Sequence, residues 1–187
     1  MAFSSPSWDD LYATASAQAG HFTTAQAQAA GYSPQLLHKY LANGKVERIR
    51  RGVYRLVHYP SGEDEDLVVL WLWSDQEGVF SHETALARHE LSDALPAIAE
   101  MTVPRAWRKR RLRVPVGLEL HFDDIAEPDR TWHGPVPITT PARTLRDCVL
   151  AGVSRELIDQ ALAAGTQRGV LTDEDVARTR HLLEGRS

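Results

Sequence analysis

The sequence of 187 residues lacks features that several large classes of protein require. Its only cysteine, Cys148, excludes an internal disulfide and a cysteine-rich zinc site. Its longest apolar run, Leu67 to Trp73, has seven residues, whereas a membrane-spanning helix needs about 20. No charged leader followed by an apolar run is present. These absences predict a cytoplasmic protein without a membrane partner. Cys148, between Leu145 and Val149, is expected to be buried in a helix.

Signatures of catalysis are also scarce. The sequence has no glycine-rich phosphate loop, no nucleophile elbow and no lysine after Lys109 to accompany the carboxylates of a nuclease site. His82-Glu83 and His89-Glu90 each resemble half of a zinc-protease motif, but the two histidines are seven residues apart instead of four. An enzyme that uses this region is an alternative. We expect no catalytic residue, no metal ligand and no cofactor.

Charge is distributed unevenly along the chain, although the net charge is only −4. Residues 1–60 hold six Lys/Arg and three Asp/Glu, whereas residues 61–104 hold one Arg and ten Asp/Glu. The stretch HYPSGED (58–64) lies at this change of sign and is typical of a linker. The length suits one large or two small domains. We therefore predict a DNA-binding domain over 1–60 and a second domain over 61–187.

Residues 23–57 have the order helix, tight turn, helix, two-stranded ribbon. This order is typical of a winged helix-turn-helix. Thr23 and Gln26 predict a capping box at the start of the first helix. Ser33-Pro34 predicts the N-cap and first residue of the second. The sequence KVERIRRGVYRLV then predicts a basic hairpin.

The second of these helices separates an apolar face (Leu37, Tyr40, Leu41) from polar and cationic side chains on the outside. Such side chains suit contact with bases and phosphates, and arginines at the turn of a ribbon can reach phosphates or a minor groove. The alternative is a module that docks a protein and never contacts DNA. The residues predicted to bind DNA are Thr24, Ser33, Gln35, His38, Lys39, Lys45, Arg48, Arg50 and Arg51.

A second basic segment, RAWRKRRLR (105–113), holds six bases around Trp107. Because it lacks Asn and Gln, it favours phosphate contact over sequence reading, with Trp107 as its only side chain able to stack on a base. The alternatives are contact with a toxin and a solvated loop between two strands. The residues concerned are Arg105, Arg108, Lys109, Arg110, Arg111 and Arg113.

Helices and short strands in mixed order predict an α+β fold, with a mixed α+β second domain. Arg143 and Asp147, one helical turn apart, predict a buried or half-buried ion pair. Helices are expected over 8–19, 64–73, 81–90, 140–150 and 154–165 and from 172 onward. Strands are expected over 78–80, 101–103, 112–116 and 118–122.

The order of these segments resembles the AbiEi family of antitoxins, from type IV (abortive infection) toxin–antitoxin systems. The winged-helix segment, FTTAQAQAAGYSPQLLHKYLANGKVERIRRGVYRL, is followed by GVFSHETALARHELSD, MTVPRAWRKRR and ITTPARTLRDC in the family's order. SHETAL and TPARTLRD are the more specific pieces.

This resemblance implies a phage-defence protein with two tasks. Its N-terminal domain would bind double-stranded operator DNA, in the form of inverted repeats, and repress its own operon. Its second domain would counteract a nucleotidyltransferase-like toxin, functionally or by direct contact. The alternative is a winged-helix regulator or protein-docking adaptor without antitoxin activity.

Overall fold

The structure, a computed structural model, describes residues 5–185 and divides into two compact units. One unit runs up to Gln76 and includes Gly134–Val136; the other comprises Glu77–His133 and the chain from Pro137 onward. The first unit therefore continues beyond residue 60. It does so through helix α4 (Glu65–Trp73), whose Glu65 accepts a 3.1 Å hydrogen bond from Arg55. Each unit mixes helices with a sheet, which confirms the α+β class.

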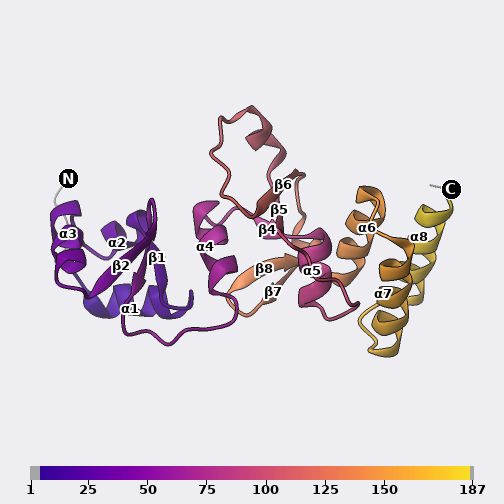
Figure 1. Ribbon diagram of the computed structural model, residues 1–187, viewed down its shortest axis with the longest axis horizontal. Coiled ribbons are helices and arrows are strands. Elements are labelled where there is room, and N and C mark those ends of the chain that lie inside the picture. The colour runs from indigo at the N-terminus through magenta and orange to yellow at the C-terminus, as the bar shows by residue number, and fades with distance from the viewer. Residues whose placement is uncertain (1–4, 186–187) are drawn as a thin grey trace. The chain divides into compact units, whose positions relative to one another are not determined.

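Residues 8–56 of the first unit, coloured indigo to purple in Figure 1, form a winged helix-turn-helix. Its sheet has the order β1-β3-β2, and both strand pairs are antiparallel. We call the β2–β3 ribbon the wing. The elements, in chain order, are α1 (Trp8–Ser16), β1 (His21–Thr23), α2 (Thr24–Ala29), α3 (Pro34–Ala42), β2 (Val46–Arg50) and β3 (Val53–Leu56).

Local signals fix the starts of these helices as the sequence predicts. The Thr23 hydroxyl accepts the Gln26 amide at 3.1 Å while the Gln26 side chain accepts the Thr23 amide at 2.8 Å, which is the expected capping box. Ser33 accepts the Leu36 amide at 3.2 Å and so caps α3. Between the two helices, Gly31 has a φ of 85°, a conformation that glycine adopts without steric cost.

A compact apolar core joins α1, α2, α3 and the sheet. Strand β1, which the sequence analysis did not predict, contributes the fully buried Phe22, and its backbone pairs with Tyr54 of β3. An isolated hairpin is only marginally stable. The pairing of β1 with β3 therefore stabilises the wing. The most buried members of the core are Leu11, Ala15, Phe22, Ala27, Tyr32, Leu37, Val46 and Leu56.

The second unit is built on a mixed sheet with strand order β6-β5-β4-β8-β7. Strands β5 and β6 are parallel, as are β4 and β8, whereas β4 and β5 are antiparallel. The strands are β4 (Val79–Phe80), β5 (Ala99–Val103), β6 (Leu118–Phe122), β7 (Arg130–His133) and β8 (Val136–Thr139). The helices are α5 (His82–Arg88), α6 (Pro141–Ala151), α7 (Arg155–Gln167) and α8 (Asp173–Glu184), with short 3-10 turns at Arg105–Lys109 and Glu127–Asp129.

The last three helices lie side by side at the orange-to-yellow end of Figure 1. The predicted burial of Cys148 is confirmed, since it lies in α6 with no exposed surface. It packs in one core with Leu86 of α5, Leu145 of α6 and Ile158 of α7. Among residues 5–185, no helix combines the length and the apolar character that a membrane crossing requires.

One predicted element of this unit is wrong. Residues 112–116 were expected to form a strand, but they have no strand structure, and the chain reaches β6 through a turn at Gly117 with a φ of 82°. Pro115 has no amide hydrogen to donate to a sheet, which explains why an alternating apolar pattern does not pair here. Strands β7 and β8 were not predicted.

Candidate nucleic-acid interface

The outer face of α3 carries the polar side chains that the sequence analysis singled out. Gln35, His38 and Lys39 are all exposed, and at 100° per residue they span about 100° of the helix surface. Leu37, on the opposite side, is 4% exposed and packs into the core. The helix therefore offers one amide, one imidazole and one ammonium group on a single surface, and its apolar side holds that surface in place.

Thr24 and Ser33 are only half-buried, and both make hydrogen bonds within the unit. Ser33 caps α3, as described above. The Thr24 amide donates to the carbonyl of Gly52 at 3.0 Å, and its hydroxyl lies 3.5 Å from the same oxygen. The N-terminus of α2 is thereby attached to the turn of the wing. These two residues position the surface, and their own contact with DNA stays a prediction.

The wing brings its arginines to the turn through an irregularity in the ribbon. The register between β2 and β3 shifts between Arg48 and Arg50, which is a β-bulge at Ile49, and Gly52 completes the turn with a φ of 82°. Arg48 and Arg51 are exposed, whereas Arg50 is half-buried. Of the three arginines, Arg48 and Arg51 are therefore the better placed to meet a ligand.

Lys45 lies between α3 and the wing and is exposed. Its Nζ sits 5.0 Å from the centroid of the Tyr40 ring, a cation–π contact that directs its charge along α3.

Arg55 of β3, unlike Lys45, is buried. It is 8% exposed and donates to the Tyr59 carbonyl at 2.8 Å and to Glu65 at 3.1 Å. Arg55 is therefore a structural arginine, and the exposed charges of the surface are those of Lys39, Lys45, Arg48 and Arg51.

The second basic segment is partly neutralised within its own unit. Arg105 donates through Nε to Asp123 at 2.7 Å, and Arg110 lies 3.8 Å from Glu77. Trp107 is 3% exposed and donates through its indole nitrogen to Glu77 at 3.3 Å. The expectation that Trp107 could stack on a base is therefore wrong, because its ring belongs to the core.

The remaining bases of this segment are directed outward. Lys109, Arg111 and Arg113 are exposed, and so is Arg108, whose guanidinium lies 5.5 Å from the centroid of the Phe122 ring. Exposed cations in an irregular stretch can follow a phosphate backbone without reading sequence. The segment thus consists of six exposed cations, of which Arg105 and Arg110, with side chains 69% and 50% exposed, pair with carboxylates.

In the second unit, the predicted pair of Arg143 and Asp147 is confirmed and is part of a larger network. Arg143 Nε lies 2.9 Å from both carboxylate oxygens of Asp147, and the same guanidinium contacts Asp123 at 2.6 Å and Asp129 at 3.1 Å. The Arg143 side chain is 5% exposed. Three carboxylates from separate parts of the chain thus surround one buried cation.

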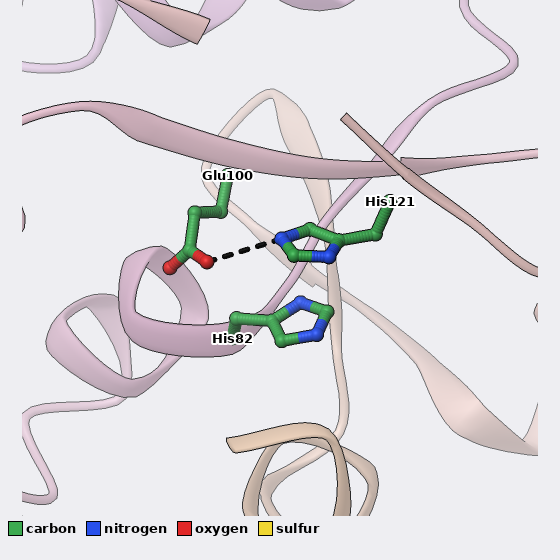
Figure 2. A group of neighbouring side chains, drawn as sticks. All are labelled: His82, Glu100 and His121. Carbon is green, nitrogen blue, oxygen red and sulfur yellow. Dashed lines mark hydrogen bonds and ion pairs between the residues drawn. The ribbon is translucent and has the colours of Figure 1, made fainter. Parts of the chain in front are cut away.

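The two histidines that resembled half of a metal motif do not meet. His89 lies 2.7 Å from the carbonyl of Thr139, whereas His82 meets Glu100 and His121, which the sequence analysis did not select (Figure 2). Burial, and next the proximity of His121, lower the pKa of His82 to about 4. Burial opposes ionisation of Glu100, but hydrogen bonds from His121 and the Glu83 amide outweigh it and lower the Glu100 pKa.

Comparison with known proteins bears on the first unit. Residues 9–57 match the family model described as "Transcriptional regulator, AbiEi antitoxin". No curated protein matches the chain. Among solved structures, the chain is similar to the RV2827C protein from Mycobacterium tuberculosis, with 15% sequence identity and a TM-score of 0.43 over 93% of this chain and 79% of that one.

Proposed function

Because the chain carries, over residues 9–57, the transcriptional-regulator segment of AbiEi antitoxins, we propose that it is a type IV antitoxin that represses its own operon. The toxin it counteracts is of the nucleotidyltransferase-like class. The single observation that supports DNA binding most strongly is the exposed face of α3, with Gln35, His38 and Lys39 beside a wing whose turn bears exposed arginines. The matched residues include α3 and both strands of the wing.

In this proposal α3 enters the major groove of the operator. The first residues of a recognition helix approach the base edges, and Gln35 is the second residue of α3. Its amide can both donate and accept a hydrogen bond, as bidentate recognition of adenine requires. Lys39, one turn further along, supplies a cation that suits a phosphate. His38 lies between them on the same face.

The wing supplies contacts that do not depend on sequence. Arg48 and Arg51 are proposed to contact phosphates or to enter the adjacent minor groove, with Lys45 between the wing and α3. Since each neutralised phosphate releases counterions, binding through these residues should weaken steeply as salt rises. An operator of inverted repeats has two equivalent half-sites, and each would bind this surface of one copy of the chain.

We assign toxin neutralisation to the second domain, and this assignment rests on the family alone.

The exposed bases Lys109, Arg111 and Arg113 are proposed to extend the DNA surface through phosphate contacts. Charge reversal of these three residues should then lower operator affinity and leave protection from the toxin intact. Intact repression with lost protection would instead assign the segment to the toxin.

Binding to DNA from upstream of the chain's own gene, together with a growth assay, tests the proposal. The unmodified chain should bind this DNA more tightly than a scrambled duplex and should repress a reporter under the same promoter. It should also restore growth to cells that express a nucleotidyltransferase-like toxin from the neighbouring gene. Failure to bind the upstream DNA would overturn repression, and failure to restore growth would overturn the antitoxin role.

The two roles can be separated by truncation. The first unit runs up to Gln76 and also includes Gly134–Val136, and Arg55 hydrogen-bonds to Glu65 of α4. A fragment that ends at Gln76 is therefore better suited to the test than one that ends near residue 60. If circular dichroism shows it folded, this fragment should retain operator binding and fail to protect cells. Protection by the fragment would contradict the assignment of neutralisation to the second domain.

A further inference from the structure

Three potential metal ligands from three elements of the second unit converge in one place. His82 is the first residue of α5, Glu100 belongs to β5 and His121 belongs to β6 (Figure 2). One donor atom from each side chain lies within 4.8 Å of the other two. The parallel pairing of β5 and β6 sets Thr102 opposite His121, so Glu100, two residues before Thr102, points to the same face of the sheet.

The distances within this cluster are close to those of a metal centre. Glu100 Oε1 lies 3.1 Å from His121 Nε2. Zinc bonds of about 2.0–2.2 Å in a tetrahedral arrangement place ligand atoms roughly 3.4 Å apart. The donor nitrogen of His82 lies at most 4.8 Å from the other two donor atoms, so it would have to approach them by roughly 1.4 Å at most to reach that spacing. Rotation of the His82 side chain, whose ring is stacked 3.6 Å from that of His121, can supply such an approach.

Neighbouring groups contact two of the three side chains, as they commonly do around metal ligands. His82 Nδ1 lies 2.8 Å from the Ser81 hydroxyl, which in turn lies 2.7 Å from the hydroxyl of Thr102. The second carboxylate oxygen of Glu100 accepts the Glu83 amide at 2.8 Å. The cluster is also shielded, since His82 is 8% exposed and the side chains of Glu100 and His121 are 14% and 25% exposed.

The backbone at His82 supports a specific role for this residue. His82 has a φ of 52°, in the left-handed region that costs a non-glycine residue free energy. An ion pair between Glu100 and His121 accounts for those two side chains alone. That ion pair does not explain why the His82 ring lies against the ring of His121, a position in which His82 has an unfavourable backbone conformation.

The cluster opens onto a cavity suited to an anion. His82 and His121 both line a cavity of about 650 Å³, in which four arginines (Arg105, Arg108, Arg143 and Arg146) outnumber two carboxylates (Asp123 and Asp147). Three protein ligands leave a coordination position for a further molecule. Guanidinium groups match phosphate oxygens in charge and geometry.

We propose that His82, Glu100 and His121 bind one divalent transition-metal ion of the zinc class, and that its open position takes a phosphate-type oxyanion held by the arginines of the cavity. Imidazole nitrogens and a single carboxylate are donors that zinc accepts. This site is separate from α3 and the wing, and it does not depend on the chain binding an operator.

Calorimetric titration of the full chain, stripped of metal by a chelator, with Zn²⁺ tests the metal site. The unmodified chain should bind one ion, and Glu100→Gln and His121→Gln should each weaken binding by roughly 10–100-fold or more. His58→Gln is the matched control, because His58 is an exposed histidine in the other unit, and it should leave the affinity unchanged. No binding, or equal affinity in all four proteins, would overturn the proposal.

A measurement on the unmodified chain avoids dependence on how the variants fold. X-ray absorption of the Zn²⁺ complex should count two imidazole ligands, and a count of none would contradict the assignment. For the open position, inorganic phosphate is the probe. It should alter the visible absorption of the Co²⁺-loaded chain, and the change should be lost in Arg105→Ala/Arg108→Ala. A Co²⁺ spectrum that phosphate leaves unchanged would overturn the oxyanion part.

Discussion

Two regions of the molecule, the surface of α3 and the wing in the first unit and the Arg143 network in the second, use charged residues in opposite ways. In the first, Lys39, Arg48 and Arg51 are exposed, and local features such as a helix face and a bulged turn organise them. In the second, Arg143 is nearly inaccessible and is held by Asp147, one helical turn away, and by Asp123 and Asp129, which lie 20 and 14 residues earlier in the sequence. The first arrangement suits recognition of a polyanion, and the second joins parts of a fold. A cation's role therefore depends on where its counter-charge lies, within the chain or outside it.

The largest expected effect lies in the buried network. Arg143→Ala leaves three carboxylates without their common cation, and we expect a loss of about 3 kcal/mol in the free energy of unfolding. The matched control is Arg155→Ala, because Arg155 also pairs with a carboxylate one turn away, Asp159, but is 70% exposed. That control should lose less than about 0.5 kcal/mol. Urea denaturation followed by tryptophan fluorescence measures both, and equal losses would remove the distinction between the units.

The next effect concerns the face of α3. Gln35→Ala should weaken operator binding by about 1–3 kcal/mol and relax sequence preference, because an amide that reads a base is lost. Lys39→Ala should weaken binding to all sequences more evenly. Fluorescence anisotropy with operator and scrambled duplexes measures both changes. Gln167→Ala, an exposed glutamine on α7, is the control and should bind like the unmodified chain. Gln35→Ala and Lys39→Ala variants that both bind normally would remove α3 from the interface.

How far the sequence predicts structure depends on whether an element is set by local or by distant neighbours. The capping box of α2, the start of α3 and the basic ribbon depend on neighbours within a few residues, so these parts of the winged helix could be predicted, whereas β1 could not. Arg143 and Asp147 could be paired because they are one helical turn apart. Strands β7 and β8 could not be predicted, since their pairing depends on the assembly of the sheet. Residues 112–116 alternate like a strand but find no partner.

The candidate sites show the same limit. His82, Glu100 and His121 are brought together by the pairing of β5 with β6 and by the start of α5, and no local spacing indicates this. The histidines that the sequence did place near each other, His82 and His89, have different partners. Trp107 was expected to be available for stacking because of its basic neighbours, but it is buried and donates a hydrogen bond to Glu77, 30 residues earlier. The roles of the α3 and wing residues stay predictions.

The wing should show a smaller effect, visible mainly as salt dependence. Arg48→Ala/Arg51→Ala removes two exposed cations, and each lost phosphate contact should lower the slope of log affinity against log salt by about 0.9. Arg48 and Arg51 are better positions for this test than Arg50. The Arg50 side chain is half-buried, so its loss could reduce binding by disturbing the fold. Arg155→Ala again serves as the control. An unchanged slope in a double variant that circular dichroism shows to be folded would exclude the wing from contact with DNA.

The smallest effect is expected at the N-terminus of α8. Burial opposes ionisation of Asp175, but hydrogen bonds from the Thr172 hydroxyl and amide and from Arg178 outweigh it and lower the Asp175 pKa below its ordinary 3.8. Because the folded pKa is lowered, the carboxylate stabilises the fold above pH 3.8, and this contribution is lost as the pH falls through the folded pKa.

Asp175→Ala should therefore cost about 1 kcal/mol at neutral pH, and the cost should shrink in acid. Denaturation midpoints of the two proteins, measured across this pH range, provide the check. A difference that stays constant with pH would mean that the carboxylate charge contributes nothing.

Site-specific crosslinking tests the central claim, that α3 binds operator DNA, most directly. Cys148 has no exposed surface and burial raises its thiol pKa, so a cysteine introduced elsewhere can be labelled selectively. His38→Cys on α3 and Arg180→Cys on α8, both at exposed positions, would each carry the same photo-crosslinker. If α3 binds the operator, crosslinks should form from position 38 to defined bases upstream of the chain's own gene and none should form from position 180. Crosslinks from position 180 with none from position 38 would contradict that claim.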